Sequence, residues 1–335
     1  MNRNMVAHCL SFAFAMAAFC INAGCTKSNS AATSPPQNTD TTTSSKPALK
    51  GKLVFHQYDS YGDAAKLYLY NFSLNTLTQL SANWNIYDPI NAHFNNDGSK
   101  IVFMGEAVAD GKWDIYIWTL GSTTSPINLT AADGCRDEDP KFSPDGLHIC
   151  FKQTPTGSNG NLKIMDLNGN ITDNVSANSV ESGMPYFTTD ENSLVYARGA
   201  GATSDIFMMH VDGTNNIPLA NINNVQEYYP ITINDSAFLY TRWYSSSNHY
   251  DQVYLGYFTN STRTRLPFNN NDADYSDAFP CNEESIVLSC DKTGGKGNYD
   301  LYIANKSTGK MWSLDLYNAQ INSSLNELGA CYSDQ

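Results

Sequence analysis

The chain has 335 residues, of which 16% are charged and 12% are aromatic, and its formal net charge is −13. This length accommodates one large domain or two ordinary ones, and a composition rich in aromatic and uncharged polar residues favours β-structure with polar turns. The negative charge argues against nucleic acid as a partner and against electrostatic attachment to anionic lipid. After residue 25, no segment approaches the roughly 18 apolar residues of a membrane-spanning helix.

The N-terminal 24 residues are typical of a secretory signal peptide. A basic start at Arg3 leads into an almost continuously apolar stretch, Val6 to Ile21, which is followed by Ala23-Gly24-Cys25. A cysteine after two small residues resembles the bacterial lipoprotein signal, in which the thiol receives the lipid and becomes the new N-terminus. The alternative is an ordinary signal peptide cleaved near Ala23. We expect a signal peptide over residues 1–24 and lipidation of Cys25.

The next segment, residues 26–50, is rich in Ser, Thr, Asn and Pro and cannot bury enough apolar surface to offset the entropy lost on ordering. We therefore expect a lipidated cysteine and disordered tether over 25–50 and a folded domain over 51–335. Removal of residues 1–24 takes the net charge from −13 to −14, so any membrane contact would come from the lipid alone. These features predict a bacterial envelope protein anchored at the outer membrane, on its periplasmic side or at the cell surface.

Five cysteines remain in the expected domain, and none of them forms a CxxC pair: Cys135, Cys150, Cys281, Cys290 and Cys331. Without such paired spacing, a zinc site is not expected. One or two disulfides and buried free thiols are both consistent with this set, so the pairing stays open.

A short apolar triplet recurs six times in the domain. The copies are Leu53-Val54-Phe55, Ile101-Val102-Phe103, Ile149-Cys150-Phe151, Leu194-Val195-Tyr196, Phe238-Leu239-Tyr240 and Ile286-Val287-Leu288, and they start 44–48 residues apart. Repeats of about 40–50 residues made of short strands are the signature of propeller blades. The triplets therefore predict six blades.

Each copy has the same internal order of four short strands. An anchor strand, marked by Phe94, Phe142, Phe187, Thr232 or Phe279, precedes a polar turn and the triplet strand, and two more strands follow. The first copy lacks its anchor strand, whereas residues 329–334 resemble an anchor strand and its turn with no triplet after them. We predict an all-β, six-bladed β-propeller of four-stranded blades, closed by the C-terminal strand joining the N-terminal blade.

The repeat has a recognisable consensus. A Phe followed by Ser-Pro-Asp-Gly and the apolar triplet, clearest at 139–151 and weaker at 91–103 and 184–196, resembles the TolB-type β-propeller repeat. The resemblance covers roughly 51–335 and implies the propeller fold. It implies little about function, because this repeat occurs in periplasmic scaffolds, in propeller domains of peptidases and in some glycan-active proteins. TolB itself carries an α/β domain before its propeller, where this chain has the expected tether.

Propeller topology separates the connections onto two faces. The connector face carries the loops between second and third strands and between blades, and the turn face carries the short turns. Function is expected on the connector face, because its loops are longer and more varied. Aromatic and acidic residues are frequent in these loops, and the binding candidates are Trp84, Asp88, Asp137, Glu138, Asp139, Glu227, Tyr228, Arg242, Trp243, Tyr244 and Asp274.

These side chains suit several kinds of ligand. Carboxylates near a central channel can bind a cation, a basic peptide or sugar hydroxyls, and exposed Trp and Tyr can stack on sugars or anchor a protein. Asp139 can equally serve only to tie adjacent blades together, and the trio 242–244 can be surface packing. No cofactor is expected, although a structural or channel divalent cation stays open.

The chain contains no GxSxG, HExxH or P-loop pattern, and its histidines lie at different places within their repeats. We therefore predict no catalytic residues and favour a non-enzymatic scaffold that holds an envelope protein or a glycan. The alternative is a propeller-fold glycan lyase or glycosidase that uses channel carboxylates, with or without a metal. The oligomeric state stays open.

Overall fold

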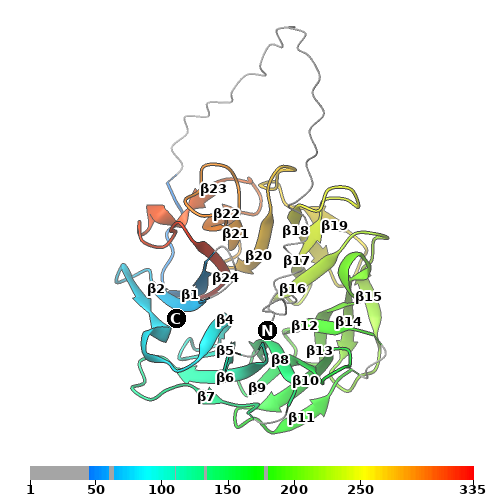
Figure 1. Ribbon diagram of the computed structural model, residues 1–335. Coiled ribbons are helices and arrows are strands. Elements are labelled where there is room, and N and C mark those ends of the chain that lie inside the picture. Colours follow the sequence, from blue (N-terminus) through cyan, green and yellow to red (C-terminus); the bar gives the residue numbers. More distant parts are fainter. Residues whose placement is uncertain (1–44, 60–63, 110, 132–133, 177–179) are drawn as a thin grey trace, which may run out of the picture. The chain divides into compact units, whose positions relative to one another are not determined.

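The computed structural model describes residues 45–59, 64–109, 111–131, 134–176 and 180–335. The chain divides into a unit of residues 1–47 and a unit of residues 48–335. The second unit is a ring of six four-stranded antiparallel sheets (Figure 1), which confirms the predicted six-bladed propeller. Within the described residues, no helix is long and apolar enough to cross a membrane.

The strands take equivalent places in every blade. The innermost strands are β24 (Asn326–Ser333), β4 (Tyr87–Phe94), β8 (Arg136–Phe142), β12 (Ser182–Phe187), β16 (Glu227–Asn234) and β20 (Tyr275–Pro280), for blades 1 to 6. The second strands are β1 (Lys52–Tyr58), β5 (Lys100–Glu106), β9 (His148–Thr154), β13 (Ser193–Arg198), β17 (Ala237–Trp243) and β21 (Ser285–Cys290). The third strands are β2 (Lys66–Asn71), β6 (Trp113–Thr119), β10 (Asn161–Asp166), β14 (Asp205–His210), β18 (Asp251–Tyr257) and β22 (Asp300–Asn305).

The outer strands are shorter than the others: β3 (Thr76–Gln79), β7 (Ile127–Asn128), β11 (Ile171–Asn174), β15 (Ile217–Ala220), β19 (Arg263–Arg265) and β23 (Met311–Ser313). Three short 3-10 helices lie in loops, namely η1 (Leu80–Asn83), η2 (Gly201–Thr203) and η3 (Leu314–Leu316). Short outer strands limit the unpaired edge that each blade presents to solvent.

The apolar triplets form the second strands, as predicted, and the first residue of every triplet has 0% of its surface exposed. A second strand is covered on both faces by the neighbouring blades. It therefore needs an unbroken apolar run instead of the alternation of a half-buried strand. Among the cysteines, Cys150, Cys281, Cys290 and Cys331 are buried free thiols.

The ring closes through the antiparallel pair of β24 and β1. Tyr332 lies opposite Leu53 and Cys331 lies opposite Val54, so the C-terminal strand becomes the innermost strand of the N-terminal blade. Tyr332 also packs into one apolar cluster with Val287 of blade 6. The predicted closure is confirmed, and both backbone pairing and side-chain packing hold it.

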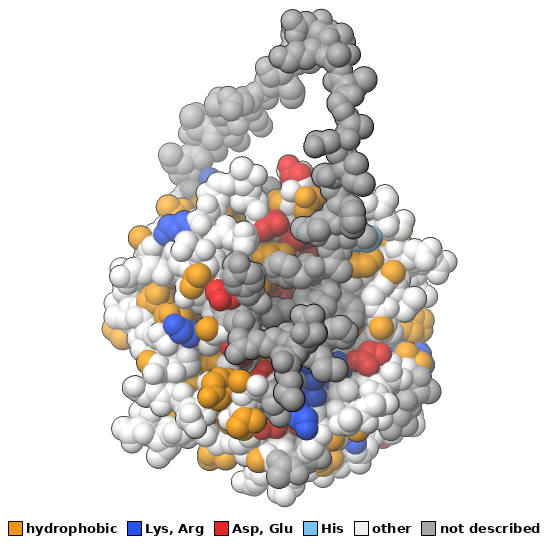
Figure 2. All heavy atoms as spheres, viewed as in Figure 1, with side chains coloured by type: hydrophobic (Ala, Val, Ile, Leu, Met, Phe, Trp, Pro, Cys, Tyr) orange, Lys and Arg blue, Asp and Glu red, His pale blue; other side chains and the backbone are white. Residues whose placement is uncertain are grey.

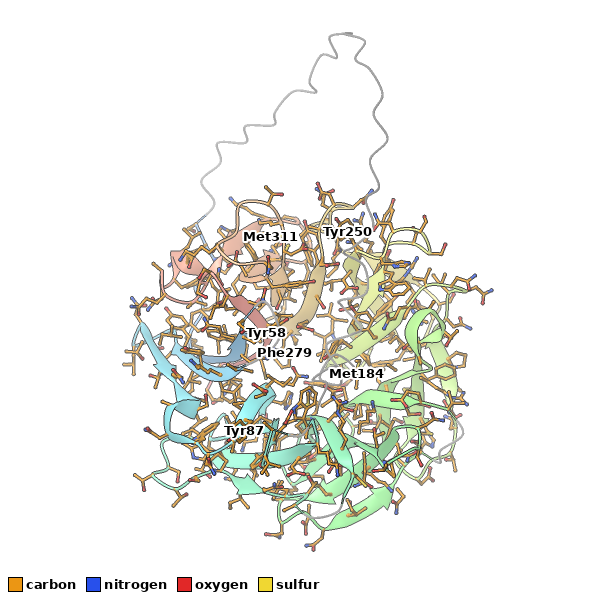
Figure 3. All side chains as sticks on the ribbon, in the orientation of Figure 1. Tyr58, Tyr87, Met184, Tyr250, Phe279 and Met311 are labelled. Carbon is orange, nitrogen blue, oxygen red and sulfur yellow. The ribbon has the colours of Figure 1, made fainter. Side chains whose placement is uncertain are left out.

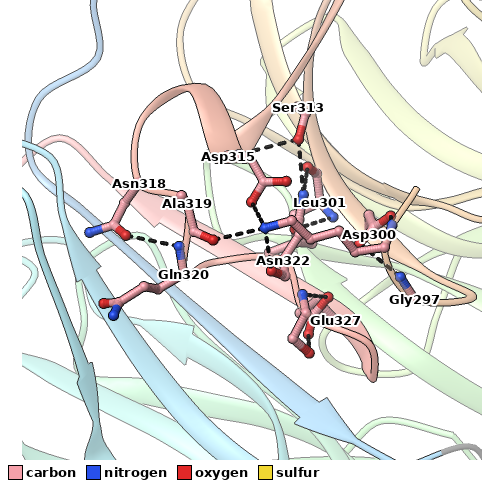
Figure 4. Close-up of polar contacts among 12 residues, drawn as sticks. Gly297, Asp300, Leu301, Ser313, Asp315, Asn318, Ala319, Gln320, Asn322 and Glu327 are labelled. Atoms are coloured by element: carbon pink, nitrogen blue, oxygen red, sulfur yellow. Dashed lines mark hydrogen bonds and ion pairs between the residues drawn. The ribbon is translucent and has the colours of Figure 1, made fainter. Parts of the chain in front are cut away.

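The connector that delivers β24 to blade 1 is fastened to blade 6 by polar contacts (Figure 4). Lys296 donates to the Asp315 carboxylate at 2.9 Å and to the backbone carbonyls of Ala319 and Asn322. Asn322 is buried, and its side-chain amide exchanges two hydrogen bonds with the backbone of Leu301 in β22. These contacts fix the path of the chain just ahead of β24.

One predicted anchor is displaced by a residue. In blade 2 the anchor Phe94 pairs with the first triplet residue, Ile101. In blade 6 Pro280 has this place, whereas Phe279 pairs with the second triplet residue. The prediction that Phe279 is equivalent to the other anchors is therefore wrong by one position, because a lone aromatic residue next to a turn does not specify strand register. Phe279 instead borders the central channel.

Truncation of residues 329–335 should abolish cooperative folding of the domain. It removes the part of β24 that pairs with Leu53 and Val54, and it leaves β1 as an exposed edge that can pair with other chains. Circular dichroism during heating should show a lost transition or aggregation. Removal of Gln335 alone, which lies beyond β24, is the control and should leave the transition unchanged. A 329–335 truncation that melts like the full chain would contradict the closure.

Candidate functional site

All six inner strands contain a residue in the left-handed region at the same place, three residues before the anchor position, and β4 contains a second one, Asp88 (φ 45°). The six equivalent residues are Asn91 (φ 53°), Asp139 (φ 54°), Met184 (φ 53°), Tyr229 (φ 48°), Asp277 (φ 52°) and Gly329 (φ 60°). The strand pairing shifts register at each of them, as in a β-bulge, and bulges redirect side chains. We call these six residues the bulge ring. It encircles the connector-face end of the channel.

Sequence analysis missed the bulge ring apart from Asp139, although a signal for it exists. The residue after each member is Ala or Pro: Ala92, Pro140, Pro185, Pro230, Ala278 and Ala330. A left-handed conformation costs a residue other than glycine roughly 1–2 kcal/mol. The surrounding structure therefore has to hold the five members other than Gly329 in this conformation. At Gly329 a side chain would also collide, because a Cβ atom there would lie 2.5 Å from Cε1 of His56.

Hydrogen bonds connect the bulge ring across the channel. Nδ2 of Asn91 donates to Oδ1 of Asp139 at 2.9 Å and to the Tyr229 hydroxyl at 3.4 Å. Asn91 and Tyr229 belong to blades 2 and 5, which are opposite each other in the ring. Figure 3 shows Met184 near the centre of the ring as well. The mouth of the channel is therefore narrowed by its own side chains.

Two residues further along each inner strand, a second set of side chains meets in the channel: His93, Lys141, Tyr186, Ile231, Phe279 and Cys331. Nδ1 of His93 accepts the backbone N–H of Phe142 at 3.3 Å, so Nε2 carries the hydrogen and donates it to the Tyr186 hydroxyl at 3.2 Å. The His93 and Phe279 rings meet edge to face at 5.8 Å. Burial holds the pKa of His93 well below its ordinary value, so this ring is neutral.

The second set interrupts the channel and leaves a cavity on either side. The cavity toward the connector face measures about 50 Å³ and touches Asn91, Tyr229 and Asp277. The cavity toward the turn face measures about 490 Å³. Both are bordered by His93 and Phe279, so these side chains form a floor between the two ends.

The bulge ring contains two carboxylates, Asp139 and Asp277, which belong to the opposite blades 3 and 6. Burial raises the pKa of Asp277 to about 6, with a further rise from the charge of Asp139 and an opposing effect of Lys141. Burial also raises the pKa of Asp139, again against the effect of Lys141. A carboxyl that is partly protonated near neutral pH can either donate or accept a proton.

Asp137 and Glu138, two of the predicted binding residues, are buried at the start of β8. Glu138 forms ion pairs with Arg136 and Lys152, both at 3.1 Å, and Lys152 continues to Glu181, ahead of blade 4, at 2.7 Å. Breaking such a buried ion pair destabilises the fold strongly, although the intact pair adds little net stability. The geometry assigns Glu138 to a link between blades 3 and 4.

Tyr228 and Asp274 join a network between blades 5 and 6. The Tyr228 hydroxyl donates to the Asp251 carboxylate, and the Asp251 backbone N–H donates to Oδ1 of Asp274 at 2.6 Å. The Tyr299 hydroxyl donates to Oδ2 of Asp274 at 2.7 Å, and burial raises the pKa of both Asp251 and Asp274.

In the part of the chain that the structure describes, no group of three or more His, Cys, Asp or Glu side chains is arranged to hold a metal ion.

Glu227 and Arg242 lie opposite each other on β16 and β17. Glu227 has 0% of its surface exposed, and burial raises its pKa to about 7 against the effect of Arg242. The Arg242 guanidinium lies 4.6 Å from the centre of the Tyr254 ring. This pair is packed within blade 5, and its carboxylate is buried.

Trp84 and Asp88 hold the connector between blades 1 and 2. Trp84 stacks on Phe103 at 5.1 Å, and it packs against an apolar cluster that blades 1 and 2 share. Asp88 accepts the backbone N–H of Ala65 at 2.8 Å. Both contacts are structural ties between neighbouring blades.

Trp243 is half-buried, and Tyr244 is exposed. Trp243 stacks on His249 at 4.0 Å, and Tyr244, with 36% of its surface exposed, covers the Arg265 guanidinium at 5.2 Å. Trp243 ends β17, and Tyr244 and His249 lie on the loop between β17 and β18. Of the two predicted residues, Tyr244 is the side chain exposed on the connector face of blade 5.

Replacing Asp277 with Asn should stabilise the protein at about pH 8. Folding raises the Asp277 pKa from 3.8 to about 6, so its stabilising contribution is present below the lower value and is lost as the pH rises through the higher one. Because Asn does not ionise, the free energy of unfolding at about pH 8 should increase by roughly 1–3 kcal/mol. Denaturant titrations between about pH 4 and pH 8 measure this change.

The control is Asp97→Asn, since the pKa of this exposed carboxyl is lowered by hydrogen bonds from Ser99. This variant should show no gain in stability at about pH 8. If the free energy of unfolding depended on pH in the same way for the wild type and Asp277→Asn, the burial of a charge at this position would be contradicted.

Comparisons with known proteins reveal the fold. No family model and no curated protein sequence matches the chain. Among solved structures, TolB from Acinetobacter baumannii is 16% identical with a TM-score of 0.64, over 85% of this chain and 67% of that chain. Hydrazine synthase from Kuenenia stuttgartiensis is 14% identical with a TM-score of 0.67, over 84% of this chain and 46% of that chain.

Oligogalacturonate lyase from Vibrio parahaemolyticus is 12% identical with a TM-score of 0.54, over 78% of this chain and 79% of that chain. For hydrazine synthase, the match spans less than half of that protein's chain. At such low identity these likenesses concern the fold alone. They confirm that the chain has the TolB-type propeller fold.

Proposed function

We propose that this protein is a lipid-anchored binding protein of the bacterial envelope and that its connector face holds a protein partner. The proposal has two parts, the location and the binding surface. The TolB-type repeat, which occurs in periplasmic scaffolds, supports an envelope location. The signal peptide and Cys25 lie outside the described residues, so the lipid anchor rests on the sequence pattern.

The distribution of exposed hydrophobic side chains carries the proposal of a binding surface. Among the described residues, large exposed hydrophobic side chains on the connector face outnumber those elsewhere; they are Tyr87, Val108, Val180, Ile222, Tyr244, Tyr250, Leu316 and Leu325. The remaining ones are Leu74 and Leu147 in turns and Ile127 and Ile171 on outer strands. Apolar side chains gathered on one face favour association with a protein there.

The arrangement of these side chains suits an extended partner. Tyr87 and Tyr250 lie further out than Met184 and Phe279, on different blades (Figure 3). In the space-filling view, hydrophobic side chains are scattered over the face shown, with Lys, Arg, Asp and Glu side chains between them (Figure 2). A partner that contacts several blades at once would bury many such side chains, and aromatic anchors often dominate the affinity of such interfaces.

The state of the channel favours binding at the surface over chemistry inside it. Asn91 bridges Asp139 and Tyr229, and His93 and Tyr186 close the channel further in. A substrate would have to displace these bonds to reach the carboxylates. The likeness to oligogalacturonate lyase keeps glycan cleavage as the competing activity, with Asp139 and Asp277 as its acids.

Replacement of Cys25 with Ser should remove the lipid anchor. In cells fed a clickable fatty acid, the wild-type protein should carry the label and sediment with membranes, because lipid on Cys25 would be its membrane contact. The Cys25→Ser protein should lose the label, whereas Cys135→Ser, which alters a thiol of the domain, should keep it. An unlabelled wild-type protein would instead indicate an ordinary signal peptide.

A photo-crosslinking amino acid at Tyr87 or Tyr250 should capture a protein partner in living cells. The controls are Leu74 and Leu147 on the turn face, which are 70% and 60% exposed, compared with 50% for Tyr87 and 41% for Tyr250. Adducts from the connector-face positions and none from the controls are expected, because only the connector face is proposed to be covered. Gel shifts and mass spectrometry measure the adducts.

Adducts from the turn face alone, or equal adducts from all four positions, would contradict this surface. Cleavage of uronate-containing oligosaccharides by the purified protein, lost in Asp139→Asn, would replace binding by glycan cleavage as the function.

A further inference from the structure

The turn-face end of the channel opens into a cavity that is separate from the connector face. This turn-face cavity measures about 490 Å³ and is bordered by the inner strands of all six blades and the turns that follow them. His93, Tyr186 and Phe279 form its floor. Its volume lies within the range of about 300–1,000 Å³ that is typical of sites for small ligands.

The chemistry of the lining is polar but almost uncharged. Amide and hydroxyl groups stand at the rim, including Asn95, Asn96, Ser143 and Thr189, and no Lys, Arg or Glu is found among the described residues that border the cavity. The lining carboxylate, Asp334, accepts a hydrogen bond from Nε2 of Gln335 at 2.6 Å. An anionic ligand would lose its hydration here and meet only the Asp334 carboxylate, so a ligand without negative charge is favoured.

Blade 5 differs from the other blades at the wall of this cavity. Thr232 pairs with the first triplet residue, the position that Phe occupies in blades 2 to 4. Thr232 is 7% exposed, and its hydroxyl has no hydrogen-bond partner among the described residues. A buried hydroxyl without a partner costs about 1–3 kcal/mol. Because Thr232 borders the cavity, rotation of its side chain would turn the hydroxyl toward a ligand hydroxyl there, which would recover this loss.

The floor supplies the apolar part of a sugar site. Phe279 is only partly buried and packs edge to face on His93, and Tyr186 packs against the same ring at 5.5 Å. Aromatic faces next to amides and hydroxyls suit a ligand with apolar C–H faces and hydroxyl edges. Saccharides without charge have both features.

We propose that the turn-face cavity binds an uncharged saccharide of one or two units. The saccharide hydroxyls bond to the amide and hydroxyl groups of the rim and to Thr232, and its C–H face rests on the aromatic floor. This site lies on the opposite face from the proposed partner surface and does not depend on it. A protein partner on the connector face and a saccharide on the turn face can therefore be bound together.

Saturation-transfer NMR on the full chain, kept in a zwitterionic detergent that carries no sugar, tests the proposal. The probes are glucose, N-acetylglucosamine and maltose, compared with the anionic sugar glucuronate. Neutral sugars should show saturation, whereas glucuronate should show little or none. No signal from any neutral sugar, or equal signals from glucuronate and the neutral sugars, would overturn the proposal.

Variants locate the site. Asn96→Trp should cover the rim and raise the dissociation constant at least tenfold, and Thr189→Trp should do so from another blade. The matched control is Asn168→Trp, an exposed position in a turn of the same face that does not border the cavity. Equal binding by the rim variants and by the control would place the sugar elsewhere and overturn the assignment.

Thr232→Val separates binding from folding. This change keeps the shape of the side chain and removes the hydroxyl without a partner, so the melting temperature should stay the same or rise. Affinity for the neutral sugar should nevertheless fall at least fivefold. An unchanged affinity would contradict a contact between the sugar and Thr232.

Discussion

The pairing of β24 with β1 is the interaction on which the ring depends. Each second strand is apolar on both faces, so every blade needs a neighbour on each side to cover it. A chain that ended before β24 would leave blade 1 without its inner strand and the ring with an open edge. A few residues at the C-terminus therefore complete a core that begins near residue 52.

The inner strands use one backbone device six times. The bulge in each strand places one residue at the connector-face end of the channel, and an Ala or a Pro follows that residue in every blade. The side chains themselves differ: an amide, two carboxylates, a thioether, a phenol and a glycine. A nearly symmetric scaffold thus carries an asymmetric centre, because the side chains of the bulge ring and of the second set in the channel differ from blade to blade.

The carboxylates on the connector face serve mainly to bind blade to blade. Glu138 reaches Glu181 through Lys152, and Tyr228 reaches Asp274 through Asp251. Propeller blades pack through apolar faces that can slide, whereas a buried polar contact has a defined geometry. Such contacts at the loop ends set the spacing of the blades and leave the hydrophobic and aromatic side chains of the loops to meet a partner.

The sequence by itself determined the blade count, the four strands of each blade and the closure, because a triplet buried on both faces is a local pattern that repeats at a regular interval. It could not determine the register of Phe279 or the bulge ring, since both depend on how one strand pairs with the next. Nor could it separate Tyr244 at the surface from Glu227 in the interior. Those outcomes arise between strands and blades that meet only in the folded ring, where burial and neighbouring charges decide what each side chain can do.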